Sequence, residues 1–222
     1  MSSVLVVAPH PDDETLGCGG TLLRHVSMGD EVHWLLVTAM DAVRFAPARI
    51  EARRREIQAV SAAYRFASVI ELGLPTARLD ALPVDELVAS IGKAVGAIKP
   101  DIVYLPFPGD AHTDHRTVFT AAIAATKWFR YPGVRRILAC EIPSETDFGL
   151  APDALPFRPN VYVDISSWLQ TKLNIMRMYA GEMAEHPFPR SEDGLRALAT
   201  LRGSQSGCEA AEAFMLLKEL VR

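Results

Sequence analysis

The chain has 222 residues, of which 49% are hydrophobic and 23% are charged, a composition typical of a soluble protein with a substantial buried core. It argues against both a disordered chain and a membrane protein. With 23 basic and 27 acidic residues the formal net charge is −4, so the chain as a whole has no positive field that would attract nucleic acid or an anionic membrane.

The first apolar run and the cysteines indicate the expected compartment. The run Val4–Ala8 is too short for a signal peptide or a membrane span, which predicts a cytoplasmic protein. The chain has an odd number of cysteines, Cys18, Cys140 and Cys208, and no Cys-x-x-Cys pair. We therefore expect neither a disulfide scaffold nor a cysteine zinc site. They are interpreted as small buried residues.

Short apolar runs alternate with amphipathic segments over the first 165 residues. The runs predicted to be buried strands are Val4–Ala8, Val32–Val37, Val69–Leu74, Ile102–Pro106, Ile137–Ile142 and Val161–Ile165. The segments predicted to be helices between them are Leu16–Met28, Ala48–Ala63, Val84–Ile98 and Thr117–Lys127. This alternation predicts a Rossmann-like α/β fold with three αβα layers and a mostly parallel sheet, because crossover helices cover both faces.

The pattern changes after residue 165, where we expect a mainly helical C-terminal portion from about 166. Its predicted helices are Ser166–Ala184, Glu192–Arg202 and Glu209–Val221. The longest irregular segments, which are of a length typical of lids or binding loops, are Ala39–Pro47, Pro143–Asn160 and Glu185–Ser191. No repeat or domain boundary is visible, so we expect one domain over 1–222.

A cluster of charged residues follows the first predicted strand. The segment Pro9–Glu14 contains one imidazole and three carboxylates, and the carboxyl ends of parallel strands are where ligands bind. Adjacent buried carboxylates repel each other, so a divalent cation would stabilise the cluster. The alternative is an acidic first turn, Asp12–Glu14, that only caps a helix.

The glycines that follow allow two interpretations. A turn such as Gly17–Gly20 can bind phosphate, which would make the chain a nucleotide-binding Rossmann-like module. However, the spacing is not Gly-x-Gly-x-x-Gly, and the two acids before it would repel a phosphate. We interpret the glycines as positions where the helix packs closely on the sheet.

A second cluster follows the predicted strand Ile102–Pro106. His112 and His115 are three residues apart, with Asp114 between them, so one turn presents two ring nitrogens and a carboxylate that can orient an imidazole. Two such clusters at strand ends rarely occur by chance.

With both motifs in view, the chain resembles the PIG-L or LmbE-like family of zinc-dependent N-acetylglucosaminyl deacetylases. The hallmarks of that family are a strand-terminal (Ala/Pro)-His-Pro-Asp-Asp-Glu and a later His-x-Asp-His, and both are present here without gaps. Weaker similarities extend over nearly the whole chain, at 52–56, 72–75, 163–165, Lys172, Tyr179 and 202–214. The resemblance implies one LmbE-like deacetylase domain and a homo-oligomer, a trimer or hexamer.

The resemblance also implies roles for individual residues. The ligands of one Zn²⁺, or of another divalent metal, would be His10, Asp13 and His115. Three protein ligands leave an open position for water, as catalytic zinc requires. Asp12 would be the general base that takes a proton from the attacking water. His112, as a protonated imidazole, would stabilise the oxyanion and hand a proton to the leaving amine, and Asp114 would orient an imidazole.

Substrate contacts are expected from two segments. In the family an arginine on the helix after the second strand commonly contacts the sugar or its substituent, and Arg53, Arg54 and Arg55 are the candidates, with Arg53, three residues before Glu56, preferred and Arg54 next. Successive helical residues lie about 100° apart, so Arg53, Arg54 and Arg55 cannot all face the cleft; those that do not would form a solvated basic face. The segment Glu185–Arg190 is expected to bring a further imidazole, His186, and the Arg190 guanidinium over the cleft, although an isolated surface histidine is usually inert.

One departure from the family concerns the sugar. Many relatives continue Leu-Gly-Leu-Pro with Asp-Gly, whereas Thr76 and Ala77 stand here, so an acidic sugar contact is expected to be missing. The sequence therefore predicts a zinc-dependent hydrolase that removes an acetyl group from an N-acetylated amino sugar or its glycoside. The alternatives are the same chemistry on a non-sugar acylated amine, an inactive metal-binding relative, and the nucleotide-binding module.

Overall fold

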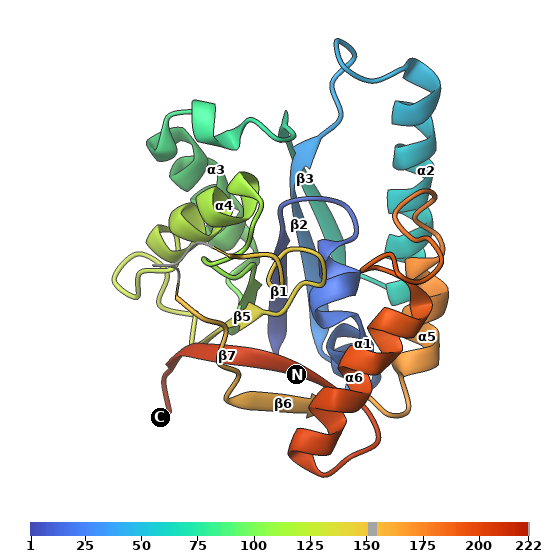
Figure 1. Cartoon of the computed structure of the whole chain (residues 1–222). Coiled ribbons are helices and arrows are strands. Elements are labelled where there is room, and N and C mark those ends of the chain that lie inside the picture. Colours follow the sequence, from blue (N-terminus) through green and yellow to red (C-terminus); the bar gives the residue numbers. More distant parts are fainter. Residues whose placement is uncertain (151–154, 222) are drawn as a thin grey trace.

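The computed structural model describes residues 1–150 and 155–221, in which a central sheet lies between two layers of helices (Figure 1). The strands are β1 Ser3–Ala8, β2 Glu31–Ala39, β3 Ser68–Pro75, β4 Ile102–Leu105, β5 Arg136–Cys140, β6 Val161–Asp164 and β7 Ala211–Glu219. The helices are α1 Asp13–Ser27, α2 Pro47–Tyr64, α3 Val84–Ile98, α4 Thr113–Ala124, α5 Leu169–Met176 and α6 Glu192–Ser206, with a 3₁₀ turn at Leu79–Ala81.

The strand order is β3-β2-β1-β4-β5-β7-β6. Strands β3, β2, β1, β4 and β5 pair in parallel, whereas β7 pairs antiparallel with both β5 and β6. The prediction of a three-layer α/β fold with a mostly parallel sheet is therefore confirmed. No helix in the described ranges is long and apolar enough to cross a membrane.

Each face of the sheet packs against its own set of helices. Val4 and Val6 of β1 point into a core formed with α1, α2, α5 and α6, and Leu5 and Val7 point into the core formed with α3 and α4. Alternate residues of one strand face opposite sides, so burial on both sides explains why the parallel strands read as continuous apolar runs. Figure 1 shows α3 and α4 on one side of the sheet and the other helices across it.

The C-terminal portion corrects two predictions. The segment Glu209–Val221 is not a helix: it contains β7, which is inserted between β5 and β6 and buries Phe214. Its Ala, Glu, Leu, Lys and Met residues favour helix intrinsically, but pairing with two strands overrides that preference. The predicted helix Ser166–Ala184 is α-helical only over Leu169–Met176. Of the predicted loop Pro143–Asn160, residues 151–154 lie outside the described ranges.

The glycines after the first charged cluster bring α1 close to its neighbours, as predicted. A Cβ atom on Gly17 would lie 2.9 Å from Cβ of Cys140 on β5, and one on Gly20 would lie 2.7 Å from Ile165. Between these two glycines α1 leaves helical geometry at Cys18, where φ is −149° and ψ is 19°. Cys18 and Cys140 are buried free thiols, as expected.

A buried ion pair spans this kink in α1. The Glu212 carboxylate on β7 accepts hydrogen bonds from the backbone N–H groups of Gly20 (2.9 Å) and Thr21 (2.7 Å). The Lys172 ammonium on α5 donates to the carbonyl of Leu16 (2.9 Å) and to Glu212 (2.7 Å). The two side chains thereby satisfy the backbone groups that the kink leaves without helical partners.

The sheet order places the charged clusters together. The chain leaves β1 toward β2 and β3 on one side and later returns to β4 on the other. The segments that follow β1 and β4 therefore flank the point where the strand order reverses, which is the usual ligand site in such sheets.

Candidate metal centre and active-site cleft

The two clusters predicted from the sequence meet at this edge of the sheet. His10 follows β1, Asp13 is the first residue of α1, and His115 lies in the first turn of α4. One ligand atom from each of the three lies within 4.8 Å of the others. The structure thus brings together the residues predicted as metal ligands from segments about 100 residues apart.

Each imidazole is oriented by a carboxylate. His10 Nε2 lies 2.9 Å from Asp114 Oδ2, and His115 Nδ1 lies 2.9 Å from Asp110 Oδ2. The opposite ring nitrogens then face Asp13 Oδ2, with His10 Nδ1 at 3.5 Å and His115 Nε2 at 3.3 Å. Such carboxylate partners fix ring orientation and tautomer in metal sites.

The residues present fit a divalent metal. The Nε2 atom of His115 is buried and has no hydrogen-bond partner among the described residues, which is costly unless another group coordinates it. Two imidazole nitrogens and one carboxylate oxygen form a donor set that zinc accepts, and three protein ligands leave a position open.

A second group of potential ligands is less suited to a metal. His10, His112 and Asp114 also lie close together. However, the Asp114 carboxylate already accepts hydrogen bonds from the backbone N–H groups of Ala77 (2.6 Å) and Leu79 (3.0 Å). Its hydrogen-bonding capacity is therefore used in orienting His10, which agrees with the predicted orienting role.

The ionic contacts shift the pKa values of the metal-free cluster. Burial lowers the pKa of His10, but hydrogen bonds with Asp114 and Asp13 and the Asp13 charge raise it overall to about 9. Burial raises the pKa of Asp13, but the charge of His115 and a hydrogen bond with His10 hold it far below its usual range. Metal binding must therefore displace protons from the imidazoles.

Asp12 lies beside the three residues in an unusual backbone conformation. Its φ is 131°, a region that residues other than glycine rarely adopt, and its N–H donates to the Glu14 carboxylate at 3.1 Å. The Arg190 guanidinium pairs with Asp12 Oδ2 at 2.9 Å. Burial and the charges of Asp13 and Glu182 raise the pKa of Asp12 well above its usual value, and Arg190 opposes this.

The His112 ring caps α4. Its Nδ1 accepts a hydrogen bond from the backbone N–H of Asp114 at 3.0 Å, so the ring proton of the neutral form is on Nε2. Burial and the charge of His10 lower the pKa of His112. Both observations favour a neutral imidazole that donates through Nε2–H, where the sequence analysis expected a protonated one.

The predicted substrate-binding residues differ in their placement. Arg53 is buried, donates to the Pro11 carbonyl at 3.0 Å and pairs with Glu182. Arg54 is exposed on α2 and lines the cavity.

Of the two side chains that the segment Glu185–Arg190 was expected to bring over the cleft, one reaches it. The structure corrects the expectation for His186, whose side chain is exposed and lies outside the residues that line the cavity. The Arg190 guanidinium does reach the cavity, where Asp12 and Glu182 hold it at 2.9 and 3.3 Å.

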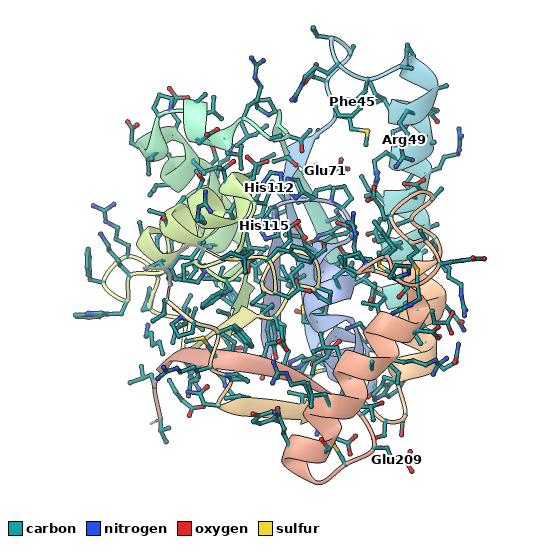
Figure 2. All side chains as sticks on the ribbon, in the orientation of Figure 1. Phe45, Arg49, Glu71, His112, His115 and Glu209 are labelled. Atoms are coloured by element: carbon teal, nitrogen blue, oxygen red, sulfur yellow. The ribbon has the colours of Figure 1, made fainter. Side chains whose placement is uncertain are left out.

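A cavity of about 370 Å³ opens above these residues. The His/Asp cluster lies on one side of it, and α2 with the segment that precedes it lies on the other. Figure 2 shows His112 and His115 on the α4 side and Phe45 toward α2. The cavity is large enough for a small organic ligand.

Sequence reasoning missed Asp110 and Glu182 as site residues, and it placed Glu14 in the first charged cluster without giving it a role of its own. Asp110 is fully buried and stands five residues before His115 in the same segment, so its position after the strand was the available signal. The contacts of Glu14 with Tyr179 and of Glu182 with Arg53 join residues more than 100 positions apart, and no local pattern indicates them.

The fold and the site define an α/β protein with a candidate divalent-metal centre in the crevice of a parallel sheet. Residues 5–126, more than half of the chain, match the model of the GlcNAc-PI de-N-acetylase family, PIG-L. The chain belongs to this family, as the resemblance implied.

Individual proteins are similar over most of the chain. A diacetylchitobiose deacetylase of Thermococcus kodakarensis is 27% identical over 96% of this chain and 82% of its own length. The solved N,N'-diacetylchitobiose deacetylase of Pyrococcus horikoshii has a TM-score of 0.79 at 22% identity, covering 98% of this chain and 84% of that one.

The same fold occurs in a protein with a different reaction. The 4-carboxy-2-hydroxymuconate hydratase GalB of Pseudomonas putida KT2440 has a TM-score of 0.74 at 20% identity and covers 100% of this chain and 98% of its own. The fold alone therefore does not determine the reaction.

Proposed function

We propose that the protein is a zinc-dependent hydrolase that removes the acetyl group from an N-acetylated amino sugar or from a glycoside or conjugate of one. The observation that carries the proposal is the buried Nε2 of His115, which makes no hydrogen bond among the described residues and faces the Asp13 carboxylate, with His10 and Asp12 beside it. The family supports the reaction class, and the Thermococcus kodakarensis relative, by its name, acts on an N-acetylated disaccharide.

The ligands of one zinc ion would be His10, Asp13 and His115. Zinc bound there supplies a Lewis acid and lowers the pKa of water toward about 7. Asp114 and Asp110 hold the two rings so that one nitrogen of each faces Asp13. The two carboxylates therefore give both rings an orientation in which they could coordinate one metal ion.

The remaining polar side chains supply proton transfer and charge stabilisation. Asp12 takes a proton from the water that attacks the amide carbonyl and releases it to the leaving amine, so that acetate and a free amine result. His112 donates a hydrogen bond through Nε2–H to the developing oxyanion. Arg190 restricts the Asp12 carboxylate, and Arg53 supports the Pro11 carbonyl next to it.

Metal analysis combined with a deacetylation assay tests the proposal. The purified chain should contain about one zinc per chain and release acetate from N-acetylglucosamine compounds, detected by mass spectrometry. Chelation should abolish the activity and zinc should restore it. Asp12→Asn should lower kcat by about 10²- to 10⁴-fold while the metal content stays unchanged.

Two results would contradict the proposal in different ways. Full activity after complete chelation would exclude the metal mechanism. Hydrolysis of non-sugar acylated amines in the same panel, with no sugar substrate accepted, would leave the amide chemistry but replace the substrate class.

A further inference from the structure

The cavity continues outward into an apolar region that the proposed chemistry does not use. Three side chains form this outer apolar wall: Met40, Phe45 and Ile50. Met40 and Phe45 lie in the segment between β2 and α2, and Ile50 lies in the first turn of α2. All three are partly exposed and line the same cavity as the His/Asp cluster, so they form part of one continuous cleft.

The position of the wall along the cleft follows from α2. Arg53 donates to the Pro11 carbonyl at 3.0 Å, so its turn of α2 lies level with the end of β1. Ile50 precedes it by three residues, roughly 4.5 Å of helix toward the N-terminus of α2. The segment that contains Phe45 continues in that direction, and Figure 2 shows Phe45 beyond His112 as seen from His115. The wall therefore lies outward from the His/Asp cluster.

Charged side chains also line the cleft. Arg54, Glu71 and Glu182 line the cavity together with Arg53, and Figure 2 shows the label of Glu71 between those of His112 and Phe45. Guanidinium and carboxylate groups are suited to hydrogen bonds with hydroxyls. The cleft thus contains the His/Asp cluster, groups that can bind hydroxyls and, outward from the cluster, an apolar surface.

The segment that carries Phe45 is held by specific contacts. The Asp41 carboxylate accepts hydrogen bonds from the N–H groups of Val43 and Arg44, both at 3.0 Å, and the N–H of Phe45 donates to the Asp41 carbonyl at 3.1 Å. The Arg44 guanidinium donates to the Thr76 carbonyl and lies 5.7 Å from the centre of the Phe45 ring. Such preorganisation reduces the entropic cost of binding a ligand.

We propose that the outer apolar wall is a subsite for an apolar aglycone, an aromatic or aliphatic group attached to the N-acetylated sugar. This inference rests on the proposed function. With the acetyl group at the His/Asp cluster and the sugar hydroxyls at the charged side chains, the next group outward meets Met40, Phe45 and Ile50. An unsubstituted sugar leaves this apolar surface in water, whereas an apolar aglycone removes it from water.

Two substrate series test the subsite on the zinc-loaded chain, with release of the free amine, the product common to both series, as the measurement. In the first series the aglycone of an N-acetylglucosaminide changes from methyl to p-nitrophenyl to octyl. We expect kcat/KM to rise by roughly tenfold or more from methyl to the apolar groups, the range that apolar pockets give. In the second series the aglycone stays methyl and the acyl chain lengthens from two to six carbons, and we expect no gain.

Variants of the wall provide a second measurement. Phe45→Ala should bring the ratio of kcat/KM for the p-nitrophenyl glycoside to that for the methyl glycoside close to one, and Phe45→Leu should retain most of the preference. Val43→Ala is the matched control, because Val43 lies in the same segment but is 95% exposed and outside the cavity lining. Circular dichroism confirms that each variant is folded.

The possible results separate the subsite from the function. Equal kcat/KM for all aglycones would overturn the subsite and leave the deacetylase in place. An increase of kcat/KM confined to the longer acyl chains would show that the wall binds the acyl group, and would overturn its assignment to the aglycone. Release of acetate from none of the sugars would overturn the proposed function and the subsite with it.

Discussion

The buried carboxylate of Glu14 accepts a hydrogen bond from the backbone N–H of Asp12 at 3.1 Å, and so holds Asp12 at a φ of 131°. A backbone conformation of this kind costs of order 1–3 kcal/mol and persists only where surrounding contacts enforce it. Here the contacts fix the direction in which the carboxylate of Asp12, the proposed base, points. Glu14 is itself fixed by hydroxyl donors, Thr15 at 2.6 Å and Tyr179 at 2.7 Å.

Replacing Glu14 with Gln should therefore reduce turnover. One oxygen of Glu14 accepts from Thr15 and Tyr179 and the other accepts from Asp12, and a Gln side chain has only one acceptor oxygen for the two positions. We expect kcat to fall by about 10²-fold through misplacement of Asp12, with KM and zinc content little changed. Tyr179→Phe, which leaves the Asp12 bond intact, should have a smaller effect; equal losses in both variants would contradict the positioning role.

Asp110 should control metal affinity without contacting the metal. Asp110→Asn weakens the acceptor for His115 Nδ1, and loss of such a partner typically lowers metal affinity by about 10- to 100-fold. Competition with a chromophoric chelator measures the change. Asp147→Asn makes the same substitution at an exposed carboxylate nearby and should leave affinity unchanged. Wild-type affinity in Asp110→Asn would refute the role.

The apparent zinc affinity should increase with pH. The pKa of His10 is about 9 in the metal-free chain and that of His115 is also raised, so at pH 7 zinc must displace protons from the rings. Asp13 has a lowered pKa and stays ionised. We expect affinity to rise by up to about tenfold per pH unit for each proton displaced, with the contribution of His10 reaching its plateau above pH 9.

Calorimetry at pH 7, 8 and 9, in buffers of different ionisation enthalpy, measures both the affinity and the protons released. Asp114→Asn removes the hydrogen bond that raises the His10 pKa, so the plateau should move to lower pH. An affinity that does not change over this range would disprove the prediction.

The ion pair of Lys172 and Glu212 should stabilise the fold as a unit. Both side chains are buried, and removing one partner from a buried pair typically costs about 3–5 kcal/mol because the other charge stays uncompensated. Lys172→Met and Glu212→Gln should each lower the free energy of unfolding in urea by roughly this amount. The double variant should lose much less than the sum of the two.

A surface pair serves as the control for that measurement. Arg54→Met removes the exposed pair of Arg54 with Glu51 and should not change the unfolding midpoint measurably. Additive losses in the Lys172 and Glu212 double variant would show that the two residues act independently.

The parts of the fold and site that were predictable are those that depend on short stretches of sequence. Runs such as Ile102–Pro106 are apolar because both faces of the strand are buried, and a local pattern is enough to find them. The three proposed ligands lie in two compact motifs at strand ends. In contrast, β7 contains good helix formers, and only its pairing with β5 and β6 makes it a strand.

Contacts between distant residues were not predictable. Arg190 pairs with Asp12 across 178 positions, and Arg53 reaches Glu182 across 129. Among the consecutive residues Arg53, Arg54 and Arg55, the sequence favoured Arg53, but it did not indicate Glu182 as the carboxylate that holds this side chain. The position of the proton on the neutral His112 ring depends on the backbone N–H of Asp114, which donates to Nδ1 where the ring caps α4, and residue types do not reveal this contact.

The Lys172–Glu212 contact with α1 also has a consequence for the order in which the protein is completed during synthesis. Asp12 and Asp13 are synthesised long before Glu212, whose carboxylate binds the backbone of Gly20 and Thr21 across about 190 positions. A nascent chain that ends before β7 contains every proposed ligand and the proposed base but lacks the carboxylate that supports α1. The first turns of α1, next to the proposed base, therefore acquire this support only when β7 is in place.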